Sequence, residues 1–165
     1  MAILPVTKGA DNPILRTASS PVKKIDKKLK KLAQDMADTM MELNGVGIAA
    51  PQVGVNLQLA LARLNVDTKR EVLLVLINPE ILQNSEHALD MEEGCLSLPG
   101  KWGSVPRGDS LTVTFQNLKG EQQTLHLEEF NARIIQHEVD HLNGMLFIDR
   151  AKKVKEENRG AAHEK

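Results

Sequence analysis

The 165-residue chain carries 21 lysines and arginines against 22 acidic residues, and this balance gives no electrostatic reason to expect direct contact with nucleic acid. Its single cysteine, Cys95, rules out a disulfide within the chain and fits a reducing compartment. No apolar run is long enough to cross a membrane, and the N-terminal residues lack the apolar core of a signal peptide. We therefore expect a cytoplasmic protein without a membrane partner.

The N-terminal part of the chain predicts an extended arm followed by a helix. Residues 7–24 contain several Gly and X-Pro turns, which are typical of a surface arm. Asp26 is a suitable helix N-cap, and apolar residues then recur at helical spacing until Asn44 and Gly45. Lysines crowd the first turns, where the helix dipole disfavours positive charge. We interpret them as a solvated face, with a basic patch for a large anionic partner as the alternative.

A glycine-rich segment follows at residues 45–54. Its glycines and alanines allow the backbone to approach another group closely. It lacks the Lys-Ser/Thr of a P-loop and the glycine spacing of a dinucleotide fingerprint, so we do not predict a phosphate site. Gln52 is the one polar side chain long enough to extend from this loop, although taken alone it reads as a solvent-facing glutamine.

The middle of the chain predicts antiparallel strands. Residues 56–64 and 71–77 form a plausible hairpin around a polar loop at 65–70, and Asn78-Pro79 is expected to end the second strand before another opens near Ile81. A second hairpin pairs the alternating apolar residues of 111–115 with those of 125–127. Strands without a βαβ rhythm predict an α+β fold: antiparallel sheets and hairpins around a central helix, with a second helix near the N-terminus.

That central helix spans residues 128–143. One arc groups two imidazoles with two apolar side chains, and the opposite arc is also apolar, so the helix should run through the core. Gly144 follows where a left-handed residue closes a helix. The two arcs comprise Phe130, Ile134, His137 and His141 on one side, and Ala132, Ile135, Val139 and Leu142 on the other. We expect a single catalytic domain at residues 1–150, followed at 151–165 by a polar tail that is either a frayed helix or disordered.

Residues 137–141 spell His-Glu-x-x-His. On a helix the two imidazoles lie one turn apart and can bind one metal ion, while Glu138 lies beside them to exchange protons with an activated water. Such five-residue matches also arise by chance. The apolar surroundings favour the metal interpretation, because buried His137 and His141 need polar partners.

A catalytic site of this kind needs a third protein ligand. Phe147 occupies the position where metzincin proteases carry a histidine, and Glu156, Glu157 and His163 lie in the polar tail, poorly suited to a buried site. Cys95 remains, although a lone cysteine is most often a small buried hydrophobe. Its neighbours, Glu92-Glu93-Gly94, favour a tight, specialised loop rather than a core strand.

Three separated segments resemble the signature motifs of the peptide deformylase family, in the same order. They are Gly45-Val46-Gly47-Ile48-Ala49-Ala50-Pro51-Gln52, Glu93-Gly94-Cys95-Leu96-Ser97 and Gln136-His137-Glu138-Val139-Asp140-His141-Leu142. The likeness extends from about Pro13 to Arg150. The chain departs from the family at Ile48, where leucine is more usual, and in the unusual stretch at residues 101–104.

The resemblance implies a hydrolase that removes the formyl group from the N-terminal methionine of newly made bacterial-type proteins, near the ribosome. It implies Cys95, His137 and His141 as ligands of one divalent metal ion, typically Fe(II), with zinc, nickel or cobalt as substitutes. Glu138 is then the general base and acid. The side chain of Gln52 and the backbone N–H of Leu96 would stabilise the oxyanion.

The same helix face suggests a pocket for an unbranched methionine side chain. Phe130 and Ile134 share the stripe of the two histidines, and Val46 and Gly47 on the glycine-rich loop could cover it. Arg133 either rims this pocket or is an exposed arginine. Asp140, expected to be buried, needs a partner, for which Arg107 is the candidate.

Two other functions share part of this pattern. A general zinc peptidase would use the same histidines and glutamate but cleave internal peptide bonds. A non-catalytic metal-binding module would keep the ligands and gain nothing from Glu138 and Gln52. Cys95 and the glycine-rich loop favour the deformylase interpretation over both.

Overall fold

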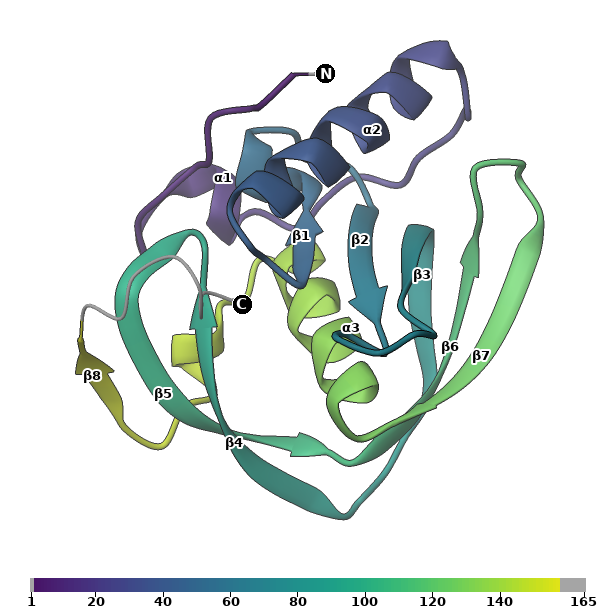
Figure 1. The fold of residues 1–165 in the computed structure, drawn as a ribbon. Helices are drawn as coiled ribbons and strands as arrows, with labels where there is room; N and C mark the ends of the chain where they lie inside the picture. Colours follow the sequence, from purple (N-terminus) through teal and green to yellow (C-terminus); the bar gives the residue numbers. More distant parts are fainter. Residues whose placement is uncertain (1, 158–165) are drawn as a thin grey trace.

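The computed structural model describes residues 2–157, which form an α+β fold with antiparallel sheets (Figure 1). A five-stranded sheet has the order β1-β2-β3-β6-β7, and a three-stranded sheet has the order β4-β5-β8. The predicted fold class is therefore confirmed. The strands of the first sheet are β1 (Gly47–Ala49), β2 (Leu59–Leu64), β3 (Val72–Asn84), β6 (Ser110–Gln116) and β7 (Gln122–Glu128); those of the second are β4 (Ala88–Cys95), β5 (Leu98–Gly108) and β8 (Val154–Glu156).

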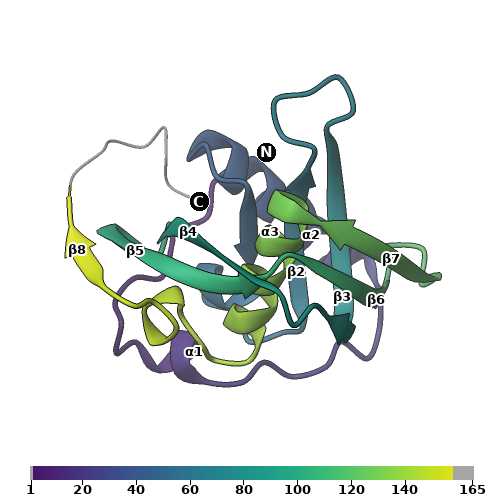
Figure 2. The same ribbon diagram turned by 90° about the horizontal axis from the view of Figure 1, so that it is seen from below.

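The central helix is α3 (Glu129–Leu142), which lies between the two sheets in Figures 1 and 2. Its apolar side chains pack on one face of the large sheet, against Leu76 and Val113 among others. Ten of its residues are buried, including four charged or titratable ones in the motif itself, as the two-sided apolar pattern predicted. Gly144 follows with a φ of 75° and closes the helix.

The opposite face of the large sheet is covered by α2 (Lys27–Glu42), seen at the top of Figure 1. Asp26 caps this helix by accepting a hydrogen bond from the Leu29 N–H at 2.9 Å, as predicted. Along each strand, successive side chains pack alternately against the two helices, because they point to opposite faces of the sheet. Leu59 and Leu61 accordingly pack with α2, while Ala62 and Leu64 pack with α3.

The N-terminal arm and the glycine-rich segment both hold more regular structure than predicted. Within residues 7–24 the arm contains a short helix, α1 (Pro13–Arg16), whose Leu15 is fully buried. The glycine-rich segment forms β1 at the edge of the large sheet, and then a 3₁₀ turn, η1 (Ala50–Val53). The predicted hairpin of β2 and β3 is confirmed, and its loop occupies residues 65–71.

The prediction that Asn78-Pro79 ends a strand is wrong. β3 continues to Asn84 and absorbs the interruption as register shifts against β6. Asn78 adopts a φ of 51° and its side chain bonds to the backbone N–H and C=O of Val22, at 2.8 and 3.0 Å. The N-terminal arm therefore holds Asn78 in this conformation, and sequence periodicity cannot predict such a long-range contact.

The segment before Cys95 is a strand, so the prediction of a tight, specialised loop there is wrong. Cys95 is the last residue of β4, and a two-residue turn at Leu96 and Ser97 leads into β5. β5 contains two prolines and three glycines and reads as a loop in the sequence. It is a strand because β4 pairs with one edge and β8 with the other.

The expected tail also contributes to the fold. Residues 154–156, predicted as a frayed helix or disordered chain, instead form β8 against residues 101–103 of β5. A second 3₁₀ turn, η2 (Phe147–Asp149), connects α3 to this strand. Residues 158–165, with His163, lie outside the described residues. Within residues 2–157, no helix has the length and apolar character needed to span a membrane.

Candidate metal centre and active site

The end of β4 meets the C-terminal half of α3 at a cluster of three buried ligand-type side chains. The ligand atoms of Cys95, His137 and His141 all lie within 4.8 Å of one another, and the exposed fractions of the three residues are 2, 7 and 1%. The Sγ of Cys95 lies 3.3 Å from Nε2 of His141. Helical spacing brings the two imidazoles together, whereas the sheet brings in the sulfur from 46 residues away.

These residues fit a divalent metal ion. A thiolate and an imidazole bound to one tetrahedral ion have S and N atoms about 3.6 Å apart, close to the separation of Cys95 and His141. Oε2 of Glu138, a buried polar atom beside the cluster, has no hydrogen-bond partner among the described residues. A thiolate with two imidazoles is also a donor set that suits first-row divalent ions.

The first histidine of the pair is held from behind by Glu93. Its Nδ1 lies 2.8 Å from Oε1 of Glu93, which leaves Nε2 for the cluster. The ring of Phe147 stacks on a face of the imidazole, with centroids 6.4 Å apart. Phe147 thus occupies the position where a third histidine was considered, and packs against a ligand-type side chain instead. His137 is oriented by one polar and one aromatic contact.

The contact between His137 and Glu93 shifts the pKa values of both side chains. Burial by itself lowers the pKa of His137, but hydrogen bonds with Cys95 and Glu93 outweigh it and raise that pKa well above its ordinary value. Burial raises the pKa of Glu93, yet hydrogen bonds from His137 and Arg107 outweigh it and leave that pKa far below its usual range. A fixed negative charge therefore lies behind His137, and it favours a cation at the imidazole.

Glu138 lies beside the cluster in a confined, water-poor position. Its exposed fraction is 3%, and Gly47 of β1 lies directly against its carboxylate. Burial raises the pKa of Glu138 to about 7, and the positive charges of His137 and Arg107 oppose this rise. A carboxyl group with a pKa near neutrality can both accept and donate a proton at physiological pH.

Gln52 points into the site and not to solvent, so the solvent-facing alternative is wrong. Its exposed fraction is 2%. The side-chain Oε1 accepts a hydrogen bond from the Ala49 N–H at 2.9 Å, and this contact turns the Nε2 amide toward the cluster. That amide lies 3.5 Å from Cys95 Sγ and 3.2 Å from Ser97 Oγ. Leu96, which is buried, follows Cys95 in the turn between β4 and β5.

A narrow apolar pocket opens beside His137 and Glu138. Four of the five residues predicted to bind substrate line it, and the fifth, Gly47, packs against Glu138 instead. Arg133 is 4% exposed, so its alternative as an exposed arginine is wrong. The lining residues are Val46, Glu93, Phe130, Arg133, Ile134, His137 and Glu138.

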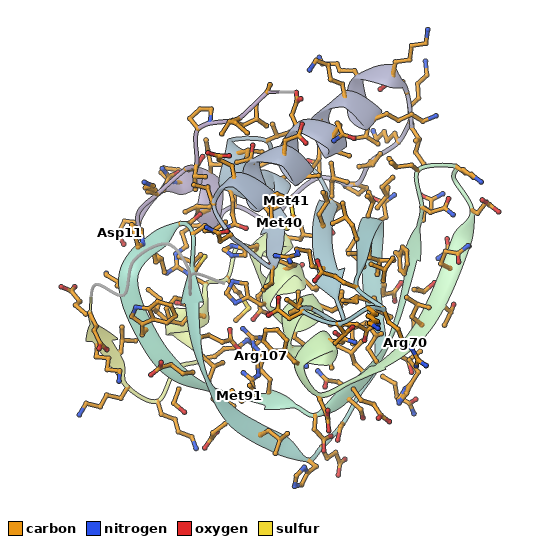
Figure 3. All side chains as sticks on the ribbon, viewed as in Figure 1. Asp11, Met40, Met41, Arg70, Met91 and Arg107 are labelled. Atoms are coloured by element: carbon orange, nitrogen blue, oxygen red, sulfur yellow. The ribbon has the colours of Figure 1, made fainter. Side chains whose placement is uncertain are left out.

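Charged side chains behind the pocket form a buried network. Arg107, labelled in Figure 3, extends from β5 toward α3 and donates to Asp140 at 2.8 Å, which confirms the predicted pair. It also donates hydrogen bonds to both carboxylate oxygens of Glu93, at 2.6 and 2.9 Å. Arg150 completes the outer end of the network with two hydrogen bonds to Asp140, at 2.7 and 2.9 Å.

Sequence reasoning missed Glu93 and Ser97 as parts of this site. Glu93 is visible in the sequence two positions before Cys95. The two side chains share one face only if this segment is an extended strand, in which side chains alternate. Because the segment was predicted to be a loop, nothing in the sequence directed the Glu93 side chain toward His137. Ser97 gave no signal beyond its nearness to Cys95.

Comparison with known proteins identifies the family. The model of the polypeptide deformylase family matches residues 3–157. A curated relative, peptide deformylase 1 of Bacillus cereus, is 46% identical over 158 residues, which cover 96% of this chain and 98% of the relative.

Solved structures agree. The crystal structure of peptide deformylase from Thermotoga maritima has a TM-score of 0.86 and 38% identity, and the match covers 93% of this chain and all of that one. A Met-Ala-Ser-bound class I type b peptide deformylase from Acinetobacter baumannii has a TM-score of 0.83 and 41% identity, covering 90% of this chain and 98% of that one. The chain therefore belongs to the polypeptide deformylase family and is a hydrolase that removes the formyl group from nascent polypeptides.

Proposed function

We propose that Cys95, His137 and His141 hold one divalent metal ion, at which this enzyme cleaves the formyl group from the N-terminal methionine of new polypeptides and releases formate. The observation that carries the proposal is the convergence of one sulfur and two imidazoles within 4.8 Å in a buried site. A bound ion would lower the pKa of a water molecule and polarise the formyl carbonyl.

Glu138 is proposed to move the proton in this reaction. Its Oε2 has no hydrogen-bond partner in the described part of the chain, so it is free to accept a proton from the attacking water. Its pKa of about 7, raised by burial, also allows the protonated form to donate to the departing amine. One carboxyl group thus serves as base and then as acid.

Gln52 and Leu96 are proposed to stabilise the oxyanion that forms on the formyl group. The Gln52 amide is fixed by the Ala49 N–H and directed toward Cys95, so its donors are oriented before substrate binds. The backbone N–H of Leu96 follows directly after Cys95 in the β4–β5 turn. The two groups would supply donors from two different elements, η1 and the β4–β5 turn.

The substrate is proposed to bind along β1 with its methionine side chain in the apolar pocket. β1 is an edge strand paired only with β2 among the described strands, so an extended peptide can add to its other edge. Val46, Phe130 and Ile134 supply an aliphatic and aromatic lining suited to an unbranched thioether. Gly47 contributes by letting the β1 backbone approach Glu138.

The metal is proposed to be Fe(II), with zinc, nickel or cobalt able to replace it. The ligand set accepts all four, and the general order of affinity does not favour iron, so availability in the cell decides. We also propose that residues 1–150 carry the catalytic unit, that the enzyme works in the cytoplasm, and that it meets its substrates near the ribosome, without direct binding to nucleic acid.

Formate release tests the proposal directly. Wild-type protein loaded anaerobically with Fe(II) should release formate from formyl-Met-Ala-Ser, whereas Cys95→Ser should bind less metal and Glu138→Ala should bind metal but turn over very slowly. Removal of the metal by a chelator should abolish activity, and added Fe(II) should restore it. Equal activity in all three proteins would refute the assignment. Cleavage of internal peptide bonds would instead indicate a general peptidase.

A further inference from the structure

The carboxylate of Glu93 accepts hydrogen bonds from three different side chains. Oε1 receives His137 Nδ1 at 2.8 Å and Arg107 Nη2 at 2.9 Å. Oε2 receives Arg107 Nε at 2.6 Å and Arg133 Nη1 at 2.5 Å. With an exposed fraction of 3%, this carboxylate has protein donors on both oxygens in place of water. Its orientation is therefore set by these three side chains.

Arg133 and His137 reach this carboxylate from the same helix. They are four residues apart on α3, hence one turn apart on one face, and they bind opposite oxygens of Glu93. Arg133 is itself fixed by two backbone carbonyls: Nη1 donates to Val105 at 2.9 Å and Nη2 donates to Leu89 at 2.6 Å. Its guanidinium thus joins α3 to β4 and β5 beside the site.

Arg133 has more hydrogen bonds than a pocket wall requires. An aliphatic side chain of similar length would line the apolar pocket equally well and avoid the cost of burying a charge. The guanidinium instead donates to Glu93 and to the carbonyls of Val105 and Leu89 at once, and a lysine could not supply this fixed, planar set of donors. The observed geometry is that of a support for the carboxylate that holds His137.

We propose that Arg133 is a positioning residue: by fixing Glu93, it sets the orientation and tautomer of His137 toward the metal ion. The inference rests on the proposed function, because it takes His137 as a metal ligand. Carboxylates behind ligating histidines fix the ring and raise its basicity, and losing such partners typically costs about 10–100-fold in metal affinity or activity. Here the support extends one residue further, from the carboxylate to Arg133.

Cobalt-loaded protein provides the test. We would compare wild type with Arg133→Met, which keeps the pocket wall, Arg133→Lys, which keeps the charge, and Arg16→Met as a control. Arg16 makes comparable contacts, to the Ala10 carbonyl and both oxygens of Asp149, away from Glu93. The readouts are the visible Co(II) spectrum and the rate of Co(II) transfer to excess chelator, supplemented by kcat and KM on formyl-Met-Ala-Ser and formyl-Ala-Ala-Ser.

We expect Arg133→Met to release Co(II) about 10–100-fold faster with an altered spectrum, Arg133→Lys to be intermediate, and Arg16→Met to match wild type. The loss in kcat should be equal on both substrates, because the effect passes through the metal ligand. A wild-type spectrum and release rate in Arg133→Met would overturn the proposal, as would a loss confined to KM for the methionine substrate. If Arg133→Met does not fold, a wild-type release rate in Arg133→Lys overturns it equally. Failure of the wild type to bind Co(II) would instead refute the proposed function.

Discussion

The contact between Gly47 and Glu138 predicts a specific effect of adding one methyl group. A Cβ built on Gly47 would lie 2.3 Å from Oε1 of Glu138 and 2.8 Å from its Cδ. Gly47 does not have a positive φ, so alanine can adopt the backbone conformation without strain. The strand can stay in place, and the carboxyl group must move.

The size of the effect follows from that overlap. To reach van der Waals distance from the new methyl group, the carboxylate must retreat by roughly 1 Å. A misplacement of about 1 Å in a catalytic group can cost ~10²-fold in rate, which corresponds to about 2.7 kcal/mol of transition-state stabilisation. We therefore expect Gly47→Ala to lower kcat by about two orders of magnitude while the protein remains folded and binds metal.

The assay is formate release from formyl-Met-Ala-Ser, with metal content and Tm measured on the same samples. Gly45→Ala is the matched control, because its Cβ would meet only two side-chain atoms closely, Leu96 Cδ1 at 3.1 Å and Met40 Cγ at 3.3 Å, and these can yield by a few tenths of an ångström. A double-mutant cycle gives the sharper measurement. In the Glu138→Ala background the obstructing carboxyl group is gone, so Gly47→Ala should cause no further loss.

Two results would refute this reasoning. A Gly47→Ala enzyme with wild-type kcat would show that the carboxylate position is not critical. A further hundredfold loss on top of Glu138→Ala would show that Gly47 acts by another route, such as direct contact with the substrate backbone.

Three further predictions concern other parts of the molecule. Arg107→Met removes the shared partner of two buried carboxylates and should lower the free energy of unfolding in urea by about 3–5 kcal/mol. Arg150→Met, which removes a side chain that is 42% exposed, should lower it by about 1 kcal/mol or less. Equal losses in the two variants would contradict the network described above. Gln52→Ala should lower kcat ~10²–10³-fold with metal content unchanged, and retained activity would remove it from the oxyanion site. Burial raises the pKa of Asp149, but hydrogen bonds, chiefly from Arg16, outweigh it and hold that pKa below 3.8, so the pair contributes stability above that pH and loses it as the pH falls further. The Tm difference between wild type and Asp149→Asn should therefore be present at pH 7 and close in acid, and a difference that persists at pH 2 would exclude this origin.

The two long helices, α2 and α3, were predictable because their signals are local. Asp26 as an N-cap, the apolar spacing of α2 and the two apolar arcs of α3 are each contained within one stretch of sequence. The β4–β5 hairpin was not predicted for the opposite reason. Most of β4 is exposed and lacks apolar alternation, and β5 contains prolines and glycines, so both are strands only because they pair with each other and with β8.

The sequence by itself determined that the two histidines share one face, because they are four residues apart on a helix, and that Glu138 lies beside them. It could nominate Cys95 only by elimination and by resemblance to a family. Tertiary structure alone decided that this sulfur lies 3.3 Å from His141, that Glu93 supports His137 from 44 positions away, and that Arg133 is buried. The contacts of Cys95 and Glu93 with the two histidines join segments more than 40 residues apart, and they depend on how the second sheet packs against α3, which no local pattern encodes.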